Sequence, residues 1–246
     1  MNILDTIVAR KKIEIAQAKE NISIQQLEQC NFFNRSTVSL SQNILKENST
    51  GIIAEFKRKS PSKGIINDKA YAVEVVKDYE QAGVSGSSVL TDTDFFGGSK
   101  EDLQNVRKEV SLPLLRKDFM IDEYQFIEAK NWGADVILLI ASILTPQQVK
   151  SFTDLAKSLH LEVLLELHGE NELNHVYHKV DMVGVNNRNL KTFEVDIEQS
   201  IRMANKLGND FVKIAESGIS NISTLKHFKQ NGFQGFLIGE NFMKTD

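Results

Sequence analysis

Eight short apolar runs recur from residue 51 onward, and a longer amphipathic stretch separates each from the next. Such alternation is typical of repeated strand and helix units built around a parallel sheet. We expect strands at Ile52–Phe56, Gly86–Leu90, Leu112–Arg116, Asp135–Ile140, Glu162–Glu166, Met182–Val185, Val212–Ala215 and Gly235–Ile238. We expect helices near Ala70–Ala82, Glu101–Val110, Asp122–Trp132, Pro146–Leu159, Asn171–His178, Asp196–Leu207 and Ile222–Asn231.

The strand count indicates the fold class. Eight strands suit a closed α/β barrel, so residues 51–246 are predicted to form a (β/α)8 TIM barrel. A doubly wound open sheet is the alternative, but it usually has fewer strands and one switch point. Residues 1–50 are interpreted as an N-terminal helical extension packed on the barrel. It has an amphipathic helix at Asn2–Lys19, a short helix at Ser23–Gln29 and a polar, mostly irregular segment to Thr50.

Composition excludes several function classes. No run approaches the roughly 20 apolar residues of a membrane span, and charges throughout the first residues are unlike a signal peptide, so a cytoplasmic location is expected. The net charge of −4 argues against a nucleic-acid binder. The single cysteine, Cys30, excludes an internal disulfide and is interpreted as a packing residue. His175 and His178 have no other ligand cluster nearby, so no metal site is expected.

A barrel places its catalytic groups at the C-terminal ends of several strands, where the loops converge. The first strand ends in Glu55 and Lys57, which share one face because side chains alternate along a strand. Ser60 follows in a basic loop. Taken alone, Glu55 and Lys57 are equally well explained as an ion pair at a strand end.

Other strand ends carry polar groups as well. Lys117, Glu166 and Glu216 follow the third, fifth and seventh apolar runs, and Asn186 and Arg188 follow the sixth. Any one of these side chains can be a strand end turned to solvent. Several together predict a shared cavity at the mouth of the barrel.

Glycines after the last two strands predict an anion site. Ser217 and Gly218 lead into one helix, and Gly239 and Glu240 open a short helix after the eighth strand. Backbone N–H groups at these two loops form the usual phosphate site of such barrels.

The order of these motifs resembles the indole-3-glycerol-phosphate synthase family across nearly the whole chain. The motifs are the run from Ile53 to Gly64, Ser88 to Asp92 with Phe95 to Gly98, Leu114 to Phe119, Leu165 to His168, Gly184 to Leu190, Ala215 to Ile219, and Ile238 to Glu240. One departure is that the chain stops at Asp246, so the family's final outer helix is expected to be absent.

The resemblance implies closure of the indole ring of 1-(2-carboxyphenylamino)-1-deoxyribulose 5-phosphate with loss of carbon dioxide and water, in tryptophan biosynthesis. This chemistry needs no metal or redox cofactor. Lys117 is our choice for the first general acid, with a pKa that burial and Lys57 lower and nearby carboxylates raise. Glu166, in an apolar run, is expected to have a raised pKa and to act as a base or proton shuttle.

The remaining roles follow from the same resemblance. Lys57 is expected both to bind the anionic substrate and to act as an acid during the dehydration, oriented by Glu55. Asn186, Arg188, Glu216 and Ser60 are expected to position the substrate and the lysines, and Phe96 and Phe119 to wall the aromatic ring. Ser217, Gly218, Gly239 and Glu240 are expected to meet the phosphate. Association with other tryptophan-pathway enzymes is also expected.

Two alternatives stay open at this stage. Another sugar-phosphate barrel, such as an isomerase, would use a carboxylate pair without a central lysine, and Lys117 argues against it. A non-catalytic phosphate-binding or partner-docking barrel would bind without turnover.

Overall fold

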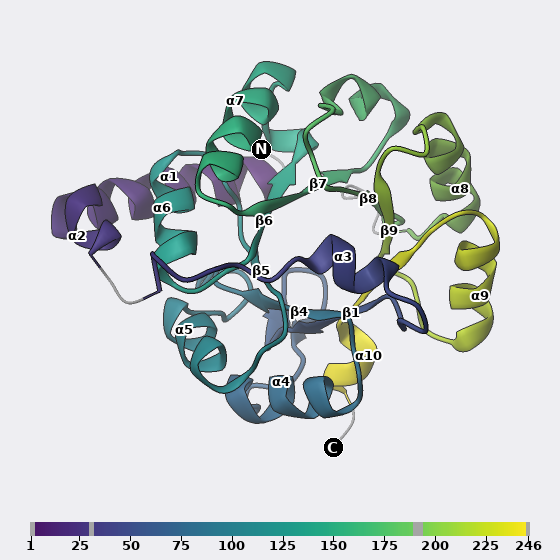
Figure 1. Cartoon of the computed structure of the whole chain (residues 1–246), viewed down its shortest axis with the longest axis horizontal. Coiled ribbons are helices and arrows are strands. Elements are labelled where there is room, and N and C mark those ends of the chain that lie inside the picture. The colour runs from purple at the N-terminus through teal and green to yellow at the C-terminus, as the bar shows by residue number, and fades with distance from the viewer. Residues whose placement is uncertain (1–2, 30–31, 189–193, 245–246) are drawn as a thin grey trace.

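A computed structural model describes residues 3–29, 32–188 and 194–244. Eight parallel strands close into one barrel, because β1 pairs with both β4 and β10 (Figure 1). The predicted (β/α)8 barrel is therefore confirmed. Around the ring, the strands are β1 (Ile52–Phe56), β4 (Gly86–Leu90), β5 (Leu114–Lys117), β6 (Val136–Ile140), β7 (Glu162–Leu167), β8 (Met182–Asn186), β9 (Val212–Glu216) and β10 (Gly235–Ile238).

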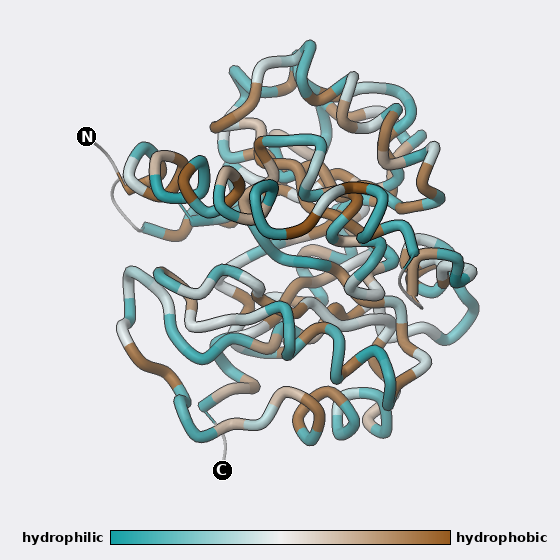
Figure 2. Tube along the Cα trace, turned by 90° about the vertical axis from the view of Figure 1, so that its left-hand side faces the viewer, coloured by the Kyte–Doolittle hydropathy of each residue, from teal (hydrophilic) through white to brown (hydrophobic). Residues whose placement is uncertain are grey.

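Helices cover the outside of this ring, and polar residues cap several of their N-termini. Ser99, Thr145, Asp196 and Asn221 each accept a backbone hydrogen bond that the first turn would otherwise leave unmade. The outer helices are α4 (Ala72–Gln81), α5 (Lys100–Glu109), α6 (Tyr124–Asn131), α7 (Pro146–Ser158), α8 (Ile197–Lys206), α9 (Ile222–Gln230) and the short α10 (Glu240–Met243). Hydrophobic and hydrophilic residues alternate along them (Figure 2), as expected for helices with one buried face.

The α-helix predicted at Asn171–His178 is wrong in type. The segment between β7 and β8 forms the 3-10 helix η2 (Glu170–His175), which packs near a second 3-10 helix, η1 (Ala141–Ile143). Glu172 turns inward to accept a hydrogen bond from the backbone N–H of His168, at 2.7 Å. The ring of His175 lies 2.9 Å from the carbonyl oxygen of Leu144. These contacts favour a short, tight turn over a regular helix.

Three helices precede the barrel strands. α1 (Ile3–Asn21) and α2 (Ile24–Glu28) lie where the sequence predicts them, whereas α3 (Leu40–Leu45) falls in the segment expected to be mostly irregular. α3 crosses one end of the barrel (Figure 1), where Leu40 and Ile44 join the interior cluster. Glu162, at the start of β7, accepts hydrogen bonds from the backbone N–H groups of α3. Cys30 lies outside the described residues.

Two apolar layers hold the fold together. Residues such as Phe56 and Val89 point outward and pack under the helices, while Ile53, Leu115, Leu164 and Ile214 fill the barrel interior. These four interior residues come from β1, β5, β7 and β9, which are alternate strands of the ring. Four side chains from alternate strands are the usual layer of such a barrel.

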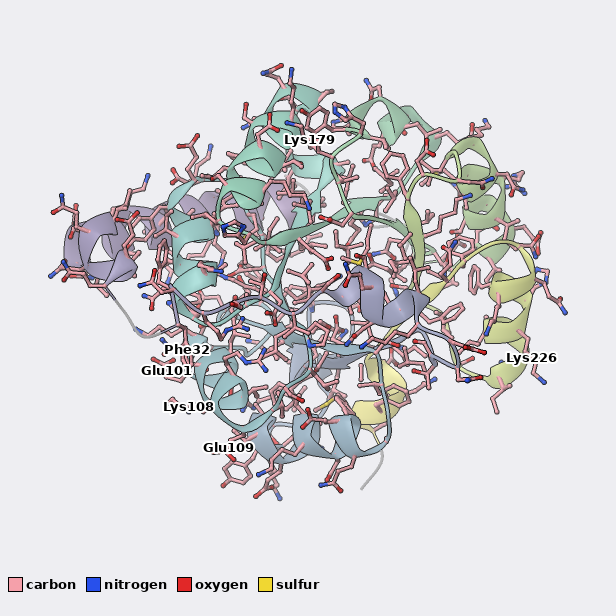
Figure 3. All side chains as sticks on the ribbon, in the orientation of Figure 1. Phe32, Glu101, Lys108, Glu109, Lys179 and Lys226 are labelled. Atoms are coloured by element: carbon pink, nitrogen blue, oxygen red, sulfur yellow. The ribbon has the colours of Figure 1, made fainter. Side chains whose placement is uncertain are left out.

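Several charged side chains of the helices point away from this core. Lys108 and Glu109 on α5 and Lys226 on α9 lie at the rim of the molecule (Figure 3). Among the described residues, no helix has both the length and the apolar character that crossing a bilayer requires.

Candidate active site

The next layer of the barrel is charged. Glu55, Lys117, Glu166 and Glu216 each lie two residues beyond an interior apolar residue of the same alternate strands, so they form a ring of four above it. Lys117 Nζ lies 2.8 Å from Glu216 Oε2 and 3.1 Å from Glu166 Oε2. All three carboxyl groups are buried. The strand-end groups predicted to share a cavity are therefore brought together.

Lys57, just after β1, pairs with Glu55 of the charged layer. Its Nζ lies 2.5 Å from Glu55 Oε1, so the ion pair considered from the sequence is present. Both residues also line the same cavity as Lys117. The ion pair therefore does not exclude a role in the site, and that role stays a prediction.

The buried carboxylates determine the protonation of Lys117. Burial alone would lower the pKa of Lys117, but the negative charges of Glu166, Glu216 and Glu55 outweigh it and raise that pKa above its ordinary value. Lys117 is therefore an ammonium at neutral pH. The competition between desolvation and carboxylates, left open by the sequence, favours the carboxylates.

The raised pKa predicted for Glu166 is wrong. Burial opposes its ionisation, but Lys117, His168 and Asn186 stabilise the carboxylate and hold the pKa of Glu166 well below its usual range. Glu216 is the group whose pKa rises, to about 7, through burial and the negative charge of Glu166. The pKa values of two neighbouring buried carboxyl groups move apart in this way, because protonating one of them relieves the repulsion between their negative charges.

A cavity of about 220 Å³ opens above this charged layer. Most predicted site residues line it, namely Glu55, Lys57, Ser60, Phe96, Lys117, Phe119, Glu166, Asn186, Arg188, Glu216, Ser217 and Glu240. Gly218 and Gly239 are not among the described lining residues, although each is the chain neighbour of one. The cavity combines an apolar wall with a few convergent polar groups, which is the usual composition of a small-molecule site.

Two aromatic rings and one amide shape this cavity. The ring centroids of Phe96 and Phe119 lie 5.9 Å apart, and together the rings form an apolar wall. Asn186 donates from Nδ2 to Glu166 Oε1 at 3.0 Å, and its Oδ1 accepts from the N–H of Arg188 at 3.1 Å. Asn186 therefore orients Glu166 and the loop after β8 together. Asn189 and Leu190, which belong to the same motif, lie outside the described residues.

Basic residues surround Glu240, which lines one rim of the cavity. Arg188 and Lys63 each lie 3.8 Å from Glu240, at the start of α10, and Lys244 donates to the same carboxylate. These contacts hold the pKa of Glu240 below its usual range, with Lys244 as the main cause. Three cations gathered around one carboxylate leave net positive charge at this rim, next to Ser217.

Sequence reasoning missed one wall of the cavity and one polar group. Ile3, Leu4 and Ile7 of α1 line the cavity, although the helix is remote from the barrel strands in sequence. Their helical spacing was visible, but spacing alone does not say what a helix covers. His168 also lines the cavity, and alternation along β7 places it on the same face as Glu166. Among the residues that the structure describes, no group of three or more His, Cys, Asp or Glu is arranged to hold a metal ion.

Comparison with known proteins decides the family. The family model described as indole-3-glycerol phosphate synthase matches residues 4–246. A protein of that name from Bacteroides thetaiotaomicron is 48% identical over 245 residues, covering 99% of this chain and 94% of the relative. The chain belongs to the indole-3-glycerol phosphate synthase family. A relative of the same name from Campylobacter fetus is 41% identical, with 99% and 95% of the two chains covered.

Solved structures with low sequence identity agree with the barrel of an indole-3-glycerol phosphate synthase. A structure of the tryptophan synthase complex from Pyrococcus furiosus superposes with a TM-score of 0.59 at 14% identity, covering 78% of this chain and 88% of that one. An N-acetylmannosamine-6-phosphate 2-epimerase from Clostridium perfringens gives 0.60 at 12% identity, covering 85% and 93%. At these identities the likeness concerns the fold alone.

Membership in the indole-3-glycerol phosphate synthase family makes the chain an enzyme of tryptophan biosynthesis, a decarboxylating lyase. A phosphorylated small molecule as substrate is consistent with that family.

Proposed function

We propose that the charged layer at the barrel mouth closes the indole ring of 1-(2-carboxyphenylamino)-1-deoxyribulose 5-phosphate with loss of carbon dioxide and water. The observation that carries this assignment of roles is the position of Lys117. It is a partly buried ammonium held between Glu166 and Glu216 and facing a cavity with an aromatic wall.

Lys117 supplies the first proton. As the ring carbon that bears the carboxyl group attacks the ketone carbon, a carbon–carbon bond forms and the carbonyl electrons move to oxygen. The ammonium of Lys117 donates a proton to that oxygen, which becomes a hydroxyl. Glu216, whose pKa is about 7 and whose Oε2 lies 2.8 Å away, resupplies the proton to Lys117.

The bond between the ring carbon and the carboxyl carbon then breaks, and carbon dioxide leaves. The electrons of that bond return to the ring, which becomes aromatic again. Dehydration follows, in which Lys57 protonates the departing hydroxyl and Glu166 takes a proton from the adjacent carbon. Glu55 holds Lys57 in place at 2.5 Å. Once Glu216 has given its proton to Lys117, the new negative charge of Glu216 raises the pKa of the neighbouring Glu166, which becomes a better base.

The remaining lining residues bind the substrate. Phe96 and Phe119 hold the aromatic ring of the substrate. Ser60, Asn186 and Arg188 hold the carboxylate and the hydroxyl groups of the substrate. Four residues at the basic rim hold the phosphate, namely Ser217, Gly218, Gly239 and Glu240. Glu240 contributes through its backbone N–H and by gathering Lys63, Arg188 and Lys244.

The test is turnover of the carboxyphenylamino substrate by the purified protein, followed through the fluorescence of the indole product without added metal. A folded sample that binds the substrate but produces no fluorescence would instead support the non-catalytic barrel. Isomerisation of a sugar phosphate, measured in parallel, would support the isomerase alternative.

Two sequence-based expectations stay predictions. One is the cytoplasmic location, and the other is association with further enzymes of the tryptophan pathway. The division of the chain into an N-terminal extension and a barrel is likewise our interpretation, supported by the contacts of α1 and α3 with the barrel.

A further inference from the structure

Two opposite strands of the barrel carry the same arrangement of charge. β1 presents Glu55 followed two residues later by Lys57, and β7 presents Glu166 followed two residues later by His168. In each case the second side chain contacts the carboxylate of the first. His168 Nε2 lies 3.0 Å from Glu166 Oε1, and both side chains line the cavity. The β7 pair is thus a counterpart of the β1 pair, with an imidazole in place of the lysine.

The other side of the imidazole ring is also held. Its Nδ1 lies 3.2 Å from the hydroxyl oxygen of Ser142, on η1. Ser142 donates to Glu172 Oε1 at 2.6 Å, and the backbone N–H of His168 donates to Glu172 Oε2 at 2.7 Å. The buried carboxylate of Glu172 therefore holds both the Ser142 hydroxyl that contacts the ring and the backbone of His168 itself. A ring supported from both sides keeps a single orientation toward Glu166.

Carboxyl groups dominate the surroundings of His168. Glu166 on β7, Glu172 on η2 and Glu216 on β9 act on it, and Lys117 on β5 acts through Glu166. Behind the ring, a second cavity of about 130 Å³ is also lined by Glu194 and Asp196. Burial lowers the pKa of His168, but Glu166, Glu172 and Glu216 outweigh it and raise that pKa above its ordinary value.

We propose that His168 is a positioning residue whose imidazolium holds Glu166 ionised and aimed into the cavity, while Ser142 and Glu172 hold the ring. This inference rests on the role of Glu166 as the base of the proposed reaction. In this role His168 acts through Glu166, whose other contacts are Lys117 at Oε2 and Asn186 at Oε1.

The sign of the pH effect follows from charge. A positive group beside a carboxylate lowers its pKa, so removing the imidazolium raises the pKa of Glu166. Glu166 must be ionised to accept a proton. The low-pH side of the kcat profile, where Glu166 becomes protonated, should therefore move to higher pH when His168 loses its charge.

Replacement by glutamine and by asparagine separates charge from orientation. Gln places an amide near the position of Nε2 and can still donate to Glu166, whereas Asn reaches only toward Ser142. For His168→Gln, which loses only the charge, we expect the low-pH limb to rise by about one unit, with KM and the kcat of the plateau nearly unchanged. For His168→Asn, which loses the contact with Glu166 as well, we expect the same shift of the limb and a fall of about tenfold in kcat.

His227→Gln is the matched control. His227 Nε2 also lies 3.0 Å from a glutamate oxygen, that of Glu198, but this pair is exposed between α8 and α9. We expect wild-type kcat, KM and pH profile for this variant. A folded His168→Gln protein with the wild-type kcat and an unmoved low-pH limb would overturn the inference.

Histidine NMR tests the pair without turnover. In the otherwise unchanged protein, Glu166→Gln should lower the pKa of His168 by about one unit or more, and should leave the titration of His227 unchanged. This NMR experiment can be carried out even when the His168→Gln protein does not fold. An unchanged His168 titration in Glu166→Gln would refute the ion pair. Absence of turnover by the wild-type protein would instead count against the proposed function, so the two failures are distinguishable.

Discussion

Lys117 and Glu216 form an ion pair of 2.8 Å although they come from opposite sides of the barrel, on β5 and β9. The pair spans the interior because both side chains belong to one layer contributed by alternate strands. Glu55 and Glu166 occupy the two remaining places of that layer. A lysine in this position meets carboxyl groups on three sides, which explains why burial does not neutralise it.

Lys117→Ala should lower kcat by roughly two to four powers of ten, the range for loss of one general acid, with little change in substrate affinity. Indole fluorescence measures the rate, and titration with substrate measures affinity. Lys108→Ala, on the outer face of α5 (Figure 3), is the control and should keep the wild-type rate. An unaltered rate in the Lys117 variant would remove this residue from the mechanism.

The pH dependence should report Glu216. Its pKa of about 7 means that the carboxyl is protonated below neutrality and loses its proton as the pH rises. Because we assign Glu216 the task of resupplying Lys117, kcat should fall as the pH rises through about 7. Glu216→Gln should reduce kcat and abolish this high-pH limb. A limb that persists in the variant would assign it to another group, and Glu109→Gln on the surface serves as the control.

Gly184→Ala should disturb the same carboxyl group. A methyl group at Gly184 on β8 would lie 2.1 Å from Glu216 Oε1, so the carboxyl group that pairs with Lys117 must shift. We expect about 1–3 kcal/mol lower unfolding free energy, as for other overpacked interiors, together with lower kcat. Gly208→Ala is the matched control, since its methyl group would meet no atom closer than 3.7 Å. Equal stability and activity in both variants would contradict the close approach.

Lys11→Met should destabilise the attachment of α1. Lys11 is buried and lies 3.0 Å from both Asp92 and Asp118, so its loss leaves two buried carboxylates without this cation. Breaking such a buried pair costs about 3–5 kcal/mol, measured by urea unfolding. Lys12→Met, at an exposed position of the same helix, is the control. Equal unfolding free energies for the two variants would contradict this account.

The pH dependence of this destabilisation has a definite sign. Despite burial, Lys11 and Arg116 hold the pKa of Asp118 below its usual range, so the stabilisation is present above the unfolded value of about 3.9. It is lost as the pH falls further, and the wild type and Lys11→Met should converge in acid. At the other end, the carboxylates outweigh burial and raise the pKa of Lys11. Its contribution is therefore present below about pH 10.4 and declines above it.

The strand pattern predicted the barrel and the four residues of the charged layer, because alternation along a strand assigns each side chain to a face. Glu55, Lys117, Glu166 and Glu216 followed from strand ends alone. The pKa order of Glu166 and Glu216 did not follow, because it depends on contacts across the barrel. Lys117, His168 and Asn186 all contact Glu166. Only His168 is near Glu166 in sequence, while Lys117 and Asn186 come from other strands.

Packing between distant segments explains the other differences. Ile3, Leu4 and Ile7 read as the apolar face of a helix, but the surface that α1 covers is set by its docking, including the buried contact of Lys11 with Asp118. η2 replaced the expected helix because Glu172 bonds inward to His168 and Ser142. Such contacts join residues from several loops, and no local pattern encodes them.

Pairing of the first strand with the last closes the ring, and the charged layer draws its members from both halves of the chain. A half-barrel that lacked β7 to β10 would expose Lys117 without Glu166 or Glu216. During refolding, turnover should therefore appear only when β1 meets β10, later than the secondary structure. The time at which turnover appears during refolding would then measure closure of the ring, which spectroscopic measures of helix content cannot detect.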